Sequence, residues 1–275
     1  FPPGSTFKVA VAAAALESGR FNPNSTFRDP VELNLPLTED TLTNFTKTAC
    51  NGGTPIALFE ALVVSCDTTF AILGLQIPDE IRGVAEDMGF NSELPFDIAT
   101  GISVFPDVPD DQEPQRAFAG IGQGDVSTTP LQMALVAASV ANGGGTPRPR
   151  LVREITDPEG GISERFSPET IGTALSSANA EQVTEMMVAV VERGTGTAAQ
   201  IEGIEVAGKT GTAQTVEGAD PHAWFISFAP ADDPQLAVAV LVENGGTLGS
   251  EATGGEVAAP IAKAILEKDR ELRGW

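Results

Sequence analysis

Pro3-Gly4-Ser5-Thr6-Phe7-Lys8 opens the chain and leads directly into an alanine-rich apolar run from Val9 to Leu16. A helix places positions i and i+3 on one face, so Lys8 can reach the Ser5 hydroxyl. The helix dipole and the unpaired backbone N–H groups at a helix N-terminus favour the alkoxide that develops during attack. The stretch therefore predicts a buried helix ending near Gly19 that presents a serine nucleophile beside a lysine. Taken alone, it also fits a capping serine and a surface lysine.

Length and composition are those of an ordinary globular protein. The chain has 275 residues, of which 41% are hydrophobic, with 29 Gly and 20 Pro. This length can bury a full core and indicates one large domain or two intimately packed ones. The longest uninterrupted apolar run is Val9 to Leu16, far shorter than the roughly 20 residues that a membrane-spanning helix needs.

The net charge is strongly negative. The 38 acidic and 16 basic residues give −22 at pH 7, which opposes binding to nucleic acid or to anionic lipid. A solubility adaptation, for instance to high salt, with carboxylates scattered over a solvated surface, would explain this charge equally well.

Cysteine and histidine are scarce. Cys50 and Cys66 are the two cysteines, and a disulfide between them would close a loop of the size for which roughly 3 kcal/mol of stabilisation is expected. We expect this disulfide in an oxidising compartment; two free buried thiols are the alternative. His222 is the sole histidine, so no metal-binding cluster is expected, and neither a metal nor another cofactor is predicted.

Element patterns suggest helices mixed with an antiparallel sheet. Stretches 22–54 and 91–123 are rich in Pro, Asp, Asn and Gly and are expected to be irregular, the first with a short hairpin. Further helices are expected at 54–65 with Thr54-Pro55 as its start, 68–75, 78–88, 129–142 with a capping box from Thr129 to Gln132, 179–192 capped by Asn179, and 257–272. Strands are expected at 205–212, 223–229 and 236–242, with an edge strand at 149–155. Short connections between the last three strands indicate antiparallel neighbours.

Two further motifs lie far apart in the chain. Ser65-Cys66-Asp67 stands at a predicted helix end, and Lys209-Thr210-Gly211-Thr212 lies in a predicted strand. The second motif alone fits an edge strand with a glycine bulge. Together with Ser5 and Lys8, the two motifs complete a three-part pattern typical of penicillin-binding proteins and serine β-lactamases.

The chain resembles the transpeptidase domain of class B penicillin-binding proteins, and most of all the actinobacterial penicillin-binding protein A group. The residues that carry this resemblance cover most of the chain: Pro3 to Lys8, Ser65-Cys66-Asp67, Gly122-Gln123-Gly124 with Thr129 to Gln132, Gly194-Thr195-Gly196, Ala207 to Gln214, and His222 to Phe225.

The resemblance implies an α/β (α+β) fold of the β-lactamase/transpeptidase type, in which helices flank an antiparallel sheet beside an all-helical subdomain. We expect one domain over residues 1–275, with a helical and loop subdomain at about 20–140 and a mainly sheet subdomain at about 145–275. Family members carry outer strands, a non-catalytic module and a membrane anchor ahead of the nucleophile, so the chain resembles a catalytic fragment with an incomplete sheet.

The activity implied is peptidoglycan D,D-transpeptidation. Ser5 would attack a D-alanyl-D-alanine stem peptide, on a lipid-linked precursor or a nascent strand, and pass the acyl group to a neighbouring stem's amine. β-Lactam antibiotics would bind covalently at the same serine. The resemblance also implies an extracytoplasmic location with an N-terminal membrane anchor absent from this chain, and cell-division or elongation proteins as partners. A D,D-carboxypeptidase, a serine β-lactamase and a non-catalytic β-lactam sensor or scaffold are the alternatives.

The resemblance also assigns roles to individual residues. Lys8 would act as base, which requires its pKa to fall from about 10.4 through burial and the nearby Lys209. Ser65 would relay a proton to the departing amine. Lys209, Thr210, Gly211 and Thr212 would bind the substrate carboxylate and line the strand, and the backbone N–H groups of Ser5 and Thr212 would form the oxyanion hole.

Two other polar residues are weaker candidates. Gln123 lies in a glycine-rich turn, where it would contact substrate or merely satisfy local backbone groups. His222 could serve as base for Ser5, but its neighbours Trp224 and Phe225 indicate a strand residue packed at the sheet.

Asp67 departs from the family pattern, which usually has asparagine at this position. An ionised aspartate only accepts hydrogen bonds, so one contact to substrate is lost unless Asp67 is protonated. If Asp67 lies about 4 Å from Lys8, an attraction of roughly 4 kcal/mol, or about three pKa units, would favour the charged lysine. Burial and Lys209 oppose this shift, so we expect a slowed or alkaline-shifted acylation.

Overall fold

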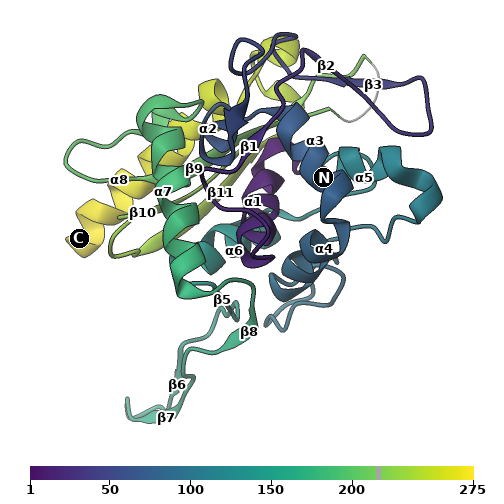
Figure 1. The fold of residues 1–275 in the computed structure, drawn as a ribbon. Helices are drawn as coiled ribbons and strands as arrows, with labels where there is room; N and C mark the ends of the chain where they lie inside the picture. The colour runs from purple at the N-terminus through teal and green to yellow at the C-terminus, as the bar shows by residue number, and fades with distance from the viewer. Residues whose placement is uncertain (215–217) are drawn as a thin grey trace.

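A three-stranded antiparallel sheet forms the centre of the computed structural model, which describes residues 1–214 and 218–275 (Figure 1). Its strands are β9 (Ala207–Ala213), β10 (His222–Ala229) and β11 (Leu236–Val242), in the order β11-β10-β9. Every residue of β10 is buried, because this central strand is covered on both faces. The three strands predicted at 205–212, 223–229 and 236–242 are confirmed within two residues at each end.

Two hydrophobic clusters lie on opposite faces of this sheet. Trp224, Ile226 and Phe228 of β10 join the larger cluster, whereas Phe225 joins the smaller one. The smaller cluster is closed by α8 (Ala259–Arg273), which follows a π-helical turn at Gly254–Ala258. The amphipathic helix predicted at 257–272 therefore covers one face, as expected.

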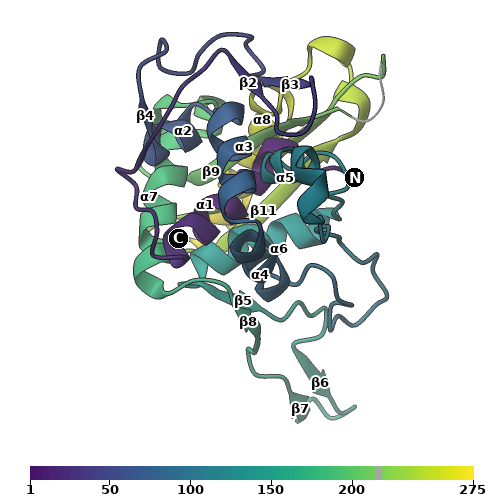
Figure 2. The same ribbon diagram turned by 45° about the vertical axis from the view of Figure 1, so that its right-hand side comes forward.

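Three helices line the other face. They are α1 (Lys8–Glu17), α6 (Pro130–Ala141) and α7 (Ser177–Arg193). Every residue of α1 from Lys8 to Leu16 is buried, and Figure 2 shows α1 enclosed by neighbouring helices. The small alanine side chains allow this close packing on all sides.

The remaining helices form a group beside α1. They are α2 (Leu58–Val63), α3 (Asp67–Gln76), α4 (Pro78–Asp87) and α5 (Glu113–Gly120). α3 and α5 approach closely through glycines: a Cβ on Gly74 would lie 2.3 Å from the Arg116 carbonyl oxygen. The mixed architecture of helices around an antiparallel sheet confirms the predicted fold class. The subdomain boundaries at about 20–140 and 145–275 remain a prediction.

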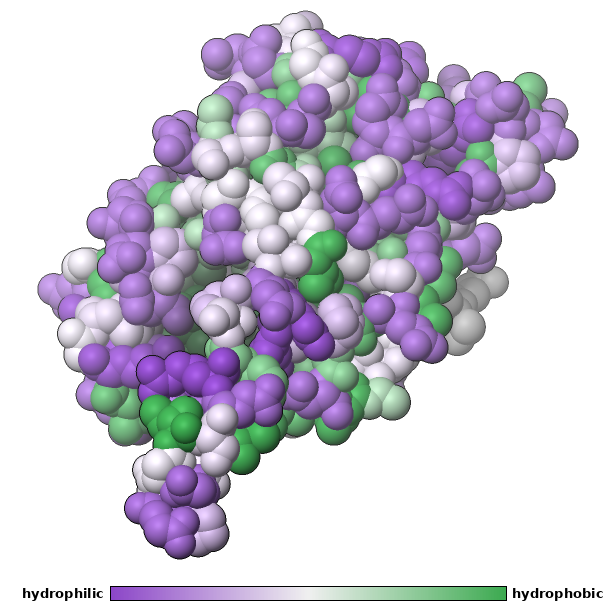
Figure 3. Space-filling model, turned by 90° about the horizontal axis from the view of Figure 1, so that it is seen from below, coloured by the Kyte–Doolittle hydropathy of each residue, from purple (hydrophilic) through white to green (hydrophobic). Residues whose placement is uncertain are grey.

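Short strands complete the molecule, and one pair projects from it. They are β1 (Thr26–Phe27), β2 (Glu32–Asn34), β3 (Thr41–Thr43), β4 (Ile56–Ala57), β5 (Gly145–Pro147), β6 (Glu154–Thr156), β7 (Ile162–Arg165) and β8 (Thr170–Thr173). The β6–β7 hairpin extends away from the body (Figure 1). Viewed from below, the surface is mainly hydrophilic with small separate apolar areas (Figure 3). Within the described residues, no helix has the length and apolar character needed to cross a membrane.

Two predicted element starts are wrong. The helix expected from Thr54-Pro55 begins at Leu58, because Ile56 and Ala57 pair with β1. The Thr54 hydroxyl donates instead to the Asn51 carbonyl of the preceding turn. Similarly, α7 begins at Ser177 rather than near Asn179, because the Ser176 hydroxyl caps the helix by accepting from the Asn179 N–H.

Two other segments also differ from expectation. The stretch 91–123 contains helix α5, whose eight residues lie among the proline, aspartate and glycine that indicated loop. Within the edge strand expected at 149–155, only Glu154 and Ile155 are strand residues, in β6. The strand that joins this region to the body is β5, which pairs with β8. The capping box at Thr129 is confirmed, since its hydroxyl accepts from the Gln132 N–H.

Candidate active site

Ser5 lies in a 3-10 turn, Gly4–Phe7, that leads into α1. Gly4 has a φ of 54° and its N–H donates to the Gly122 carbonyl at 2.9 Å. A Cβ on Gly4 would lie 2.9 Å from the Thr212 carbonyl oxygen, so this turn packs directly against β9. Ser5 is partly exposed whereas Lys8 is fully buried. The turn therefore presents one hydroxyl to solvent beside the edge of the sheet.

All hydrogen bonds of the Lys8 ammonium go to the Ser65-Cys66-Asp67 motif. Its Nζ donates to the Ser65 carbonyl at 2.8 Å, to Ser65 Oγ at 3.3 Å and to Asp67 Oδ1 at 2.7 Å. In the described part of the chain, no hydrogen bond joins Lys8 Nζ to Ser5 Oγ. Such contacts are often long before a substrate binds, so this geometry leaves the predicted base role open.

Ser65 Oγ lies between two lysines. Lys209, fully buried on β9, donates from Nζ to Ser65 Oγ at 2.8 Å and to the Thr210 carbonyl at 3.0 Å. Because both lysines donate to Ser65 Oγ, its own proton is free to point toward another acceptor. The structure thus brings the three predicted motifs together around one hydroxyl.

Burial governs the charge state of the two lysines. It lowers the pKa of Lys8 below its usual value, although the charge and hydrogen bond of Asp67 act in the opposite direction. Burial also lowers the pKa of Lys209 well below its usual value; repulsion from Lys8 lowers it further, and Asp67 opposes both. Repulsion between the two amines is mutual and disfavours charging both at once, so the expectation that Lys209 lowers the pKa of Lys8 stays a prediction.

The turn that carries Ser65 is conformationally unusual. Ser65 has a φ of 62°, in the left-handed region that non-glycine residues rarely occupy. The turn joins α2 to α3, and Cys66 is the N-cap of α3. Cys66 forms a disulfide with Cys50, with a Cα–Cα distance of 5.8 Å. This bond ties the turn to the loop before β4.

The other side of the site is the edge of β9. A Cβ on Gly211 would lie 3.0 Å from the Pro3 carbonyl oxygen, so glycine permits the close approach of β9 to the Ser5 turn. Thr212 Oγ1 accepts from the Gly254 N–H at 3.4 Å, and Thr210 Oγ1 lies 2.6 Å from Thr195 Oγ1. The Thr195 contact was missed because it joins residues 15 apart, one in the turn after α7 and one in β9.

Gln123 and His222 lie away from this network. Gln123 lines a surface cavity of about 370 Å³ together with Asp125 and Gln214. His222 is buried on β10, where its Nδ1 accepts from the Asn244 N–H at 3.0 Å. Burial lowers the pKa of His222. These contacts support a packing role for this histidine rather than a base role.

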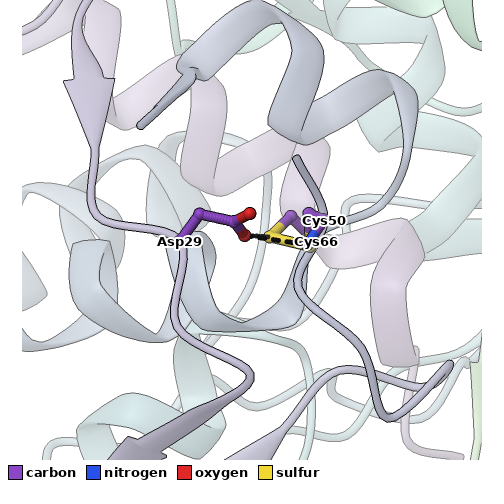
Figure 4. A group of neighbouring side chains, drawn as sticks. All are labelled: Asp29, Cys50 and Cys66. Atoms are coloured by element: carbon purple, nitrogen blue, oxygen red, sulfur yellow. Dashed lines mark hydrogen bonds between the residues drawn. A yellow bond between two sulfur atoms is a disulfide. The ribbon is translucent and has the colours of Figure 1, made fainter. Parts of the chain in front are cut away.

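One group of possible metal ligands exists among the described residues. The ligand atoms of Asp29, Cys50 and Cys66 lie within 4.8 Å of one another (Figure 4). Both sulfurs belong to the disulfide, so neither is a thiolate, and the Asp29 carboxylate accepts three backbone N–H groups. The group does not fit a metal in this state.

A model of the penicillin-binding protein transpeptidase domain matches residues 1–267. Peptidoglycan D,D-transpeptidase PbpA of Mycolicibacterium smegmatis is 40% identical over 272 residues, which cover 97% of this chain and 54% of the relative. The chain therefore spans about half the length of this curated relative.

Solved structures give the same result. Penicillin-binding protein A of M. tuberculosis, as a ceftriaxone acyl-enzyme complex, superposes with a TM-score of 0.91 at 38% identity, covering 97% of this chain and 60% of that chain. The D,D-transpeptidase domain from Eggerthella lenta superposes with a TM-score of 0.89 at 33% identity, covering 100% of this chain and 66% of that chain.

Proposed function

The chain belongs to the penicillin-binding protein transpeptidase domain family, and from this premise we propose that it is a serine peptidoglycan D,D-transpeptidase acting through an acyl-enzyme on Ser5. The observation that carries the proposal is the position of Ser65 Oγ between Lys8 Nζ and Lys209 Nζ, beside the Ser5 turn. Burial lowers the pKa of both amines, which favours a neutral base.

In the acylation step, Ser5 Oγ attacks the carbonyl carbon between the two D-alanines while Lys8 takes its proton. The negative charge on the carbonyl oxygen is stabilised by the backbone N–H groups of Ser5 and Thr212. When the peptide bond breaks, Ser65 passes its proton to the departing D-alanine amine and is reprotonated by Lys8, which returns to its neutral form. An amine of a second stem then attacks the ester, restoring the Ser5 hydroxyl and forming the cross-link.

Substrate binding is proposed along the β9 edge. Lys209, Thr210 and Thr212 bind the terminal carboxylate, and Gly211 allows β9 to lie directly against the Ser5 turn. Acylation of Ser5 by a β-lactam follows the same path, except that the leaving amine stays attached to the opened ring. The acyl-enzyme therefore persists.

Mass spectrometry with peptide mapping after incubation with benzylpenicillin tests this proposal. We expect one covalent adduct on the peptide containing Ser5, and none in Ser5→Ala. Adduct formation in Ser5→Ala, or on another residue, would overturn the assignment of the nucleophile.

The Lys8–Asp67 ion pair favours a second candidate, a β-lactam sensor with slow turnover, because Asp67 stabilises the charged lysine. Hydrolysis or aminolysis of a thioester substrate separates the two, since a sensor acylates without turning over. The accepting nucleophile in the same assay distinguishes a transpeptidase from a carboxypeptidase. The lifetime of the acyl-enzyme distinguishes both from a β-lactamase.

We also propose an extracytoplasmic location, with membrane anchoring and cell-division or elongation partners as the family resemblance implies. The Cys50–Cys66 disulfide supports the location, because disulfides persist in oxidising compartments. Labelling of intact cells with a membrane-impermeant β-lactam probe tests it.

A further inference from the structure

The Ser65–Asp67 turn is held from outside by residues 44–54, which we name the Cys50 loop. At its beginning, the Phe45 N–H donates to Asp67 Oδ2 at 3.0 Å. Asn44, which is 4% exposed, accepts from the Thr68 N–H at 3.0 Å. Further along, Cys50 is covalently bonded to Cys66. The loop therefore contacts both Asp67 and the start of α3.

The far end of the Cys50 loop is fixed by one buried carboxylate. Asp29 accepts from the N–H groups of Cys50 at 2.8 Å, Asn51 at 2.6 Å and Gly53 at 3.1 Å. Figure 4 shows its carboxylate directed at the disulfide. These bonds hold Cys50 in place, so the disulfide fixes the Ser65–Asp67 turn relative to the Cys50 loop.

We propose that the Cys50–Cys66 disulfide is a redox modification site, at which a dithiol reductant releases the Cys50 loop and thereby slows acylation of Ser5. The inference rests on the proposed function. It assigns Cys50 and Asp29 as positioning residues, since neither contacts the reacting atoms.

Thiol–disulfide exchange proceeds in two stages. A thiolate of the dithiol attacks Cys50 Sγ, because Cys50 is partly exposed whereas Cys66 is 1% exposed. The Cys50–Cys66 bond breaks and Cys66 leaves as a thiolate. The second thiol of the reductant then attacks the mixed disulfide and releases Cys50. Two electrons and two protons pass from the dithiol, which becomes a disulfide, to the two cysteines.

The surroundings of Cys66 favour it as the leaving group. It is the N-cap of α3, where the helix dipole stabilises negative charge, and the Thr68 hydroxyl lies 3.4 Å from its sulfur. Asp29 Oδ1, 3.9 Å away, opposes a thiolate, but three backbone N–H groups offset its charge.

Reduction of the disulfide affects Lys8 through Asp67. When the Cys50 loop moves, Asp67 Oδ2 loses the Phe45 N–H, and more of its negative charge acts on Lys8. Lys8 then stays protonated to higher pH and is a weaker base. The left-handed Ser65 backbone, no longer tethered through its neighbour, can also relax away from the two lysines.

The test measures acylation of the intact protein by a fluorescent penicillin across pH, before and after treatment with dithiothreitol. We expect the reduced protein to acylate at least about tenfold more slowly at neutral pH and to show its rising limb at higher pH, because small misplacements of reacting groups cost this much or more. Reoxidation should restore both. The double variant Cys50→Ser/Cys66→Ser is the matched control: it should acylate slowly throughout and not respond to dithiothreitol.

Asp29→Ala loosens the same loop while the disulfide stays intact. It should shift the pH profile in the same direction, by less than reduction does. Hydrogen exchange supplies a readout independent of acylation: reduction should speed exchange at Phe45, Cys50 and Thr68 while the amides of β10 stay protected. Global loss of protection would mean that the bond is merely structural, which overturns the inference.

The two proposals fail differently. No acylation of the oxidised protein would refute the proposed function. Equal rates and equal pH profiles for oxidised and reduced protein, with acylation intact, would refute only the redox site.

Discussion

Lys8 and Asp67 form the central charge pair of the site. Burial lowers the pKa of Lys8, while the Asp67 carboxylate, 2.7 Å away, opposes that shift. The family's usual asparagine would not carry this charge. In this chain the pKa of Lys8 therefore depends, besides burial, on the Asp67 carboxylate and on the groups that hydrogen-bond to it, among them the Phe45 N–H.

Asp67→Asn should accelerate acylation at neutral pH. Removing the carboxylate removes the force that raises the pKa of Lys8, so the neutral amine becomes available at lower pH. The rising limb of the pH–rate profile moves toward acid, with about a tenfold gain for each pKa unit on that limb. Fluorescent penicillin acylation from weakly acidic to alkaline pH measures it. If the rising limb of the pH–rate profile is the same in Asp67→Asn, Asp67 does not raise the pKa of Lys8.

At the scale of elements, sequence patterns predicted the parts whose causes are local. The mainly apolar residues of β10 and the alanine run of α1 are sufficient to predict that both elements are buried. The eight residues of α5 do not show such a pattern, and the helix packs closely against α3, a contact between distant parts of the sequence. Long-range contacts were equally hidden. The motifs predicted that Lys8 and Ser65 act together, but across a sequence separation of 57 they did not indicate the hydrogen bond from Lys8 to the Ser65 carbonyl.

The α3–α5 crossing gives a prediction about helix packing. In Gly74→Ala, the new Cβ would lie 2.3 Å from the Arg116 carbonyl oxygen, so one helix must shift, at a cost of about 1–3 kcal/mol in the free energy of unfolding. Gly83→Ala on α4 is the matched control, because no atom lies within 4 Å of its Cβ. There, better helix propensity should stabilise by about 0.5–1 kcal/mol. Urea unfolding measures the free energy of unfolding of both variants. Equal changes in the two would contradict the close packing of α3 against α5 at Gly74.

At the scale of the whole molecule, charge is unbalanced. With 38 acidic and 16 basic residues, negative charges outnumber positive ones by 22. Apart from the Lys8–Asp67 pair, every ion pair in the described residues has a partner that is clearly exposed, and such pairs contribute little. Self-repulsion among the remaining carboxylates therefore opposes the compact state.

Salt should consequently stabilise this protein. Raising NaCl from about 0.01 M to 1 M shortens the screening length from about 30 Å to 3 Å, which weakens repulsion between surface carboxylates more than it weakens the few exposed pairs. If the gain is about 1 kcal/mol, the melting temperature rises by about 2–4 °C for a chain of this size. Sucrose at equal osmolality is the control, because it favours compact states without screening charge. A melting temperature that falls with NaCl would show that the acidic surface is not under repulsive stress, and that attractive pairs such as Arg193–Glu60 contribute more than their exposure suggests.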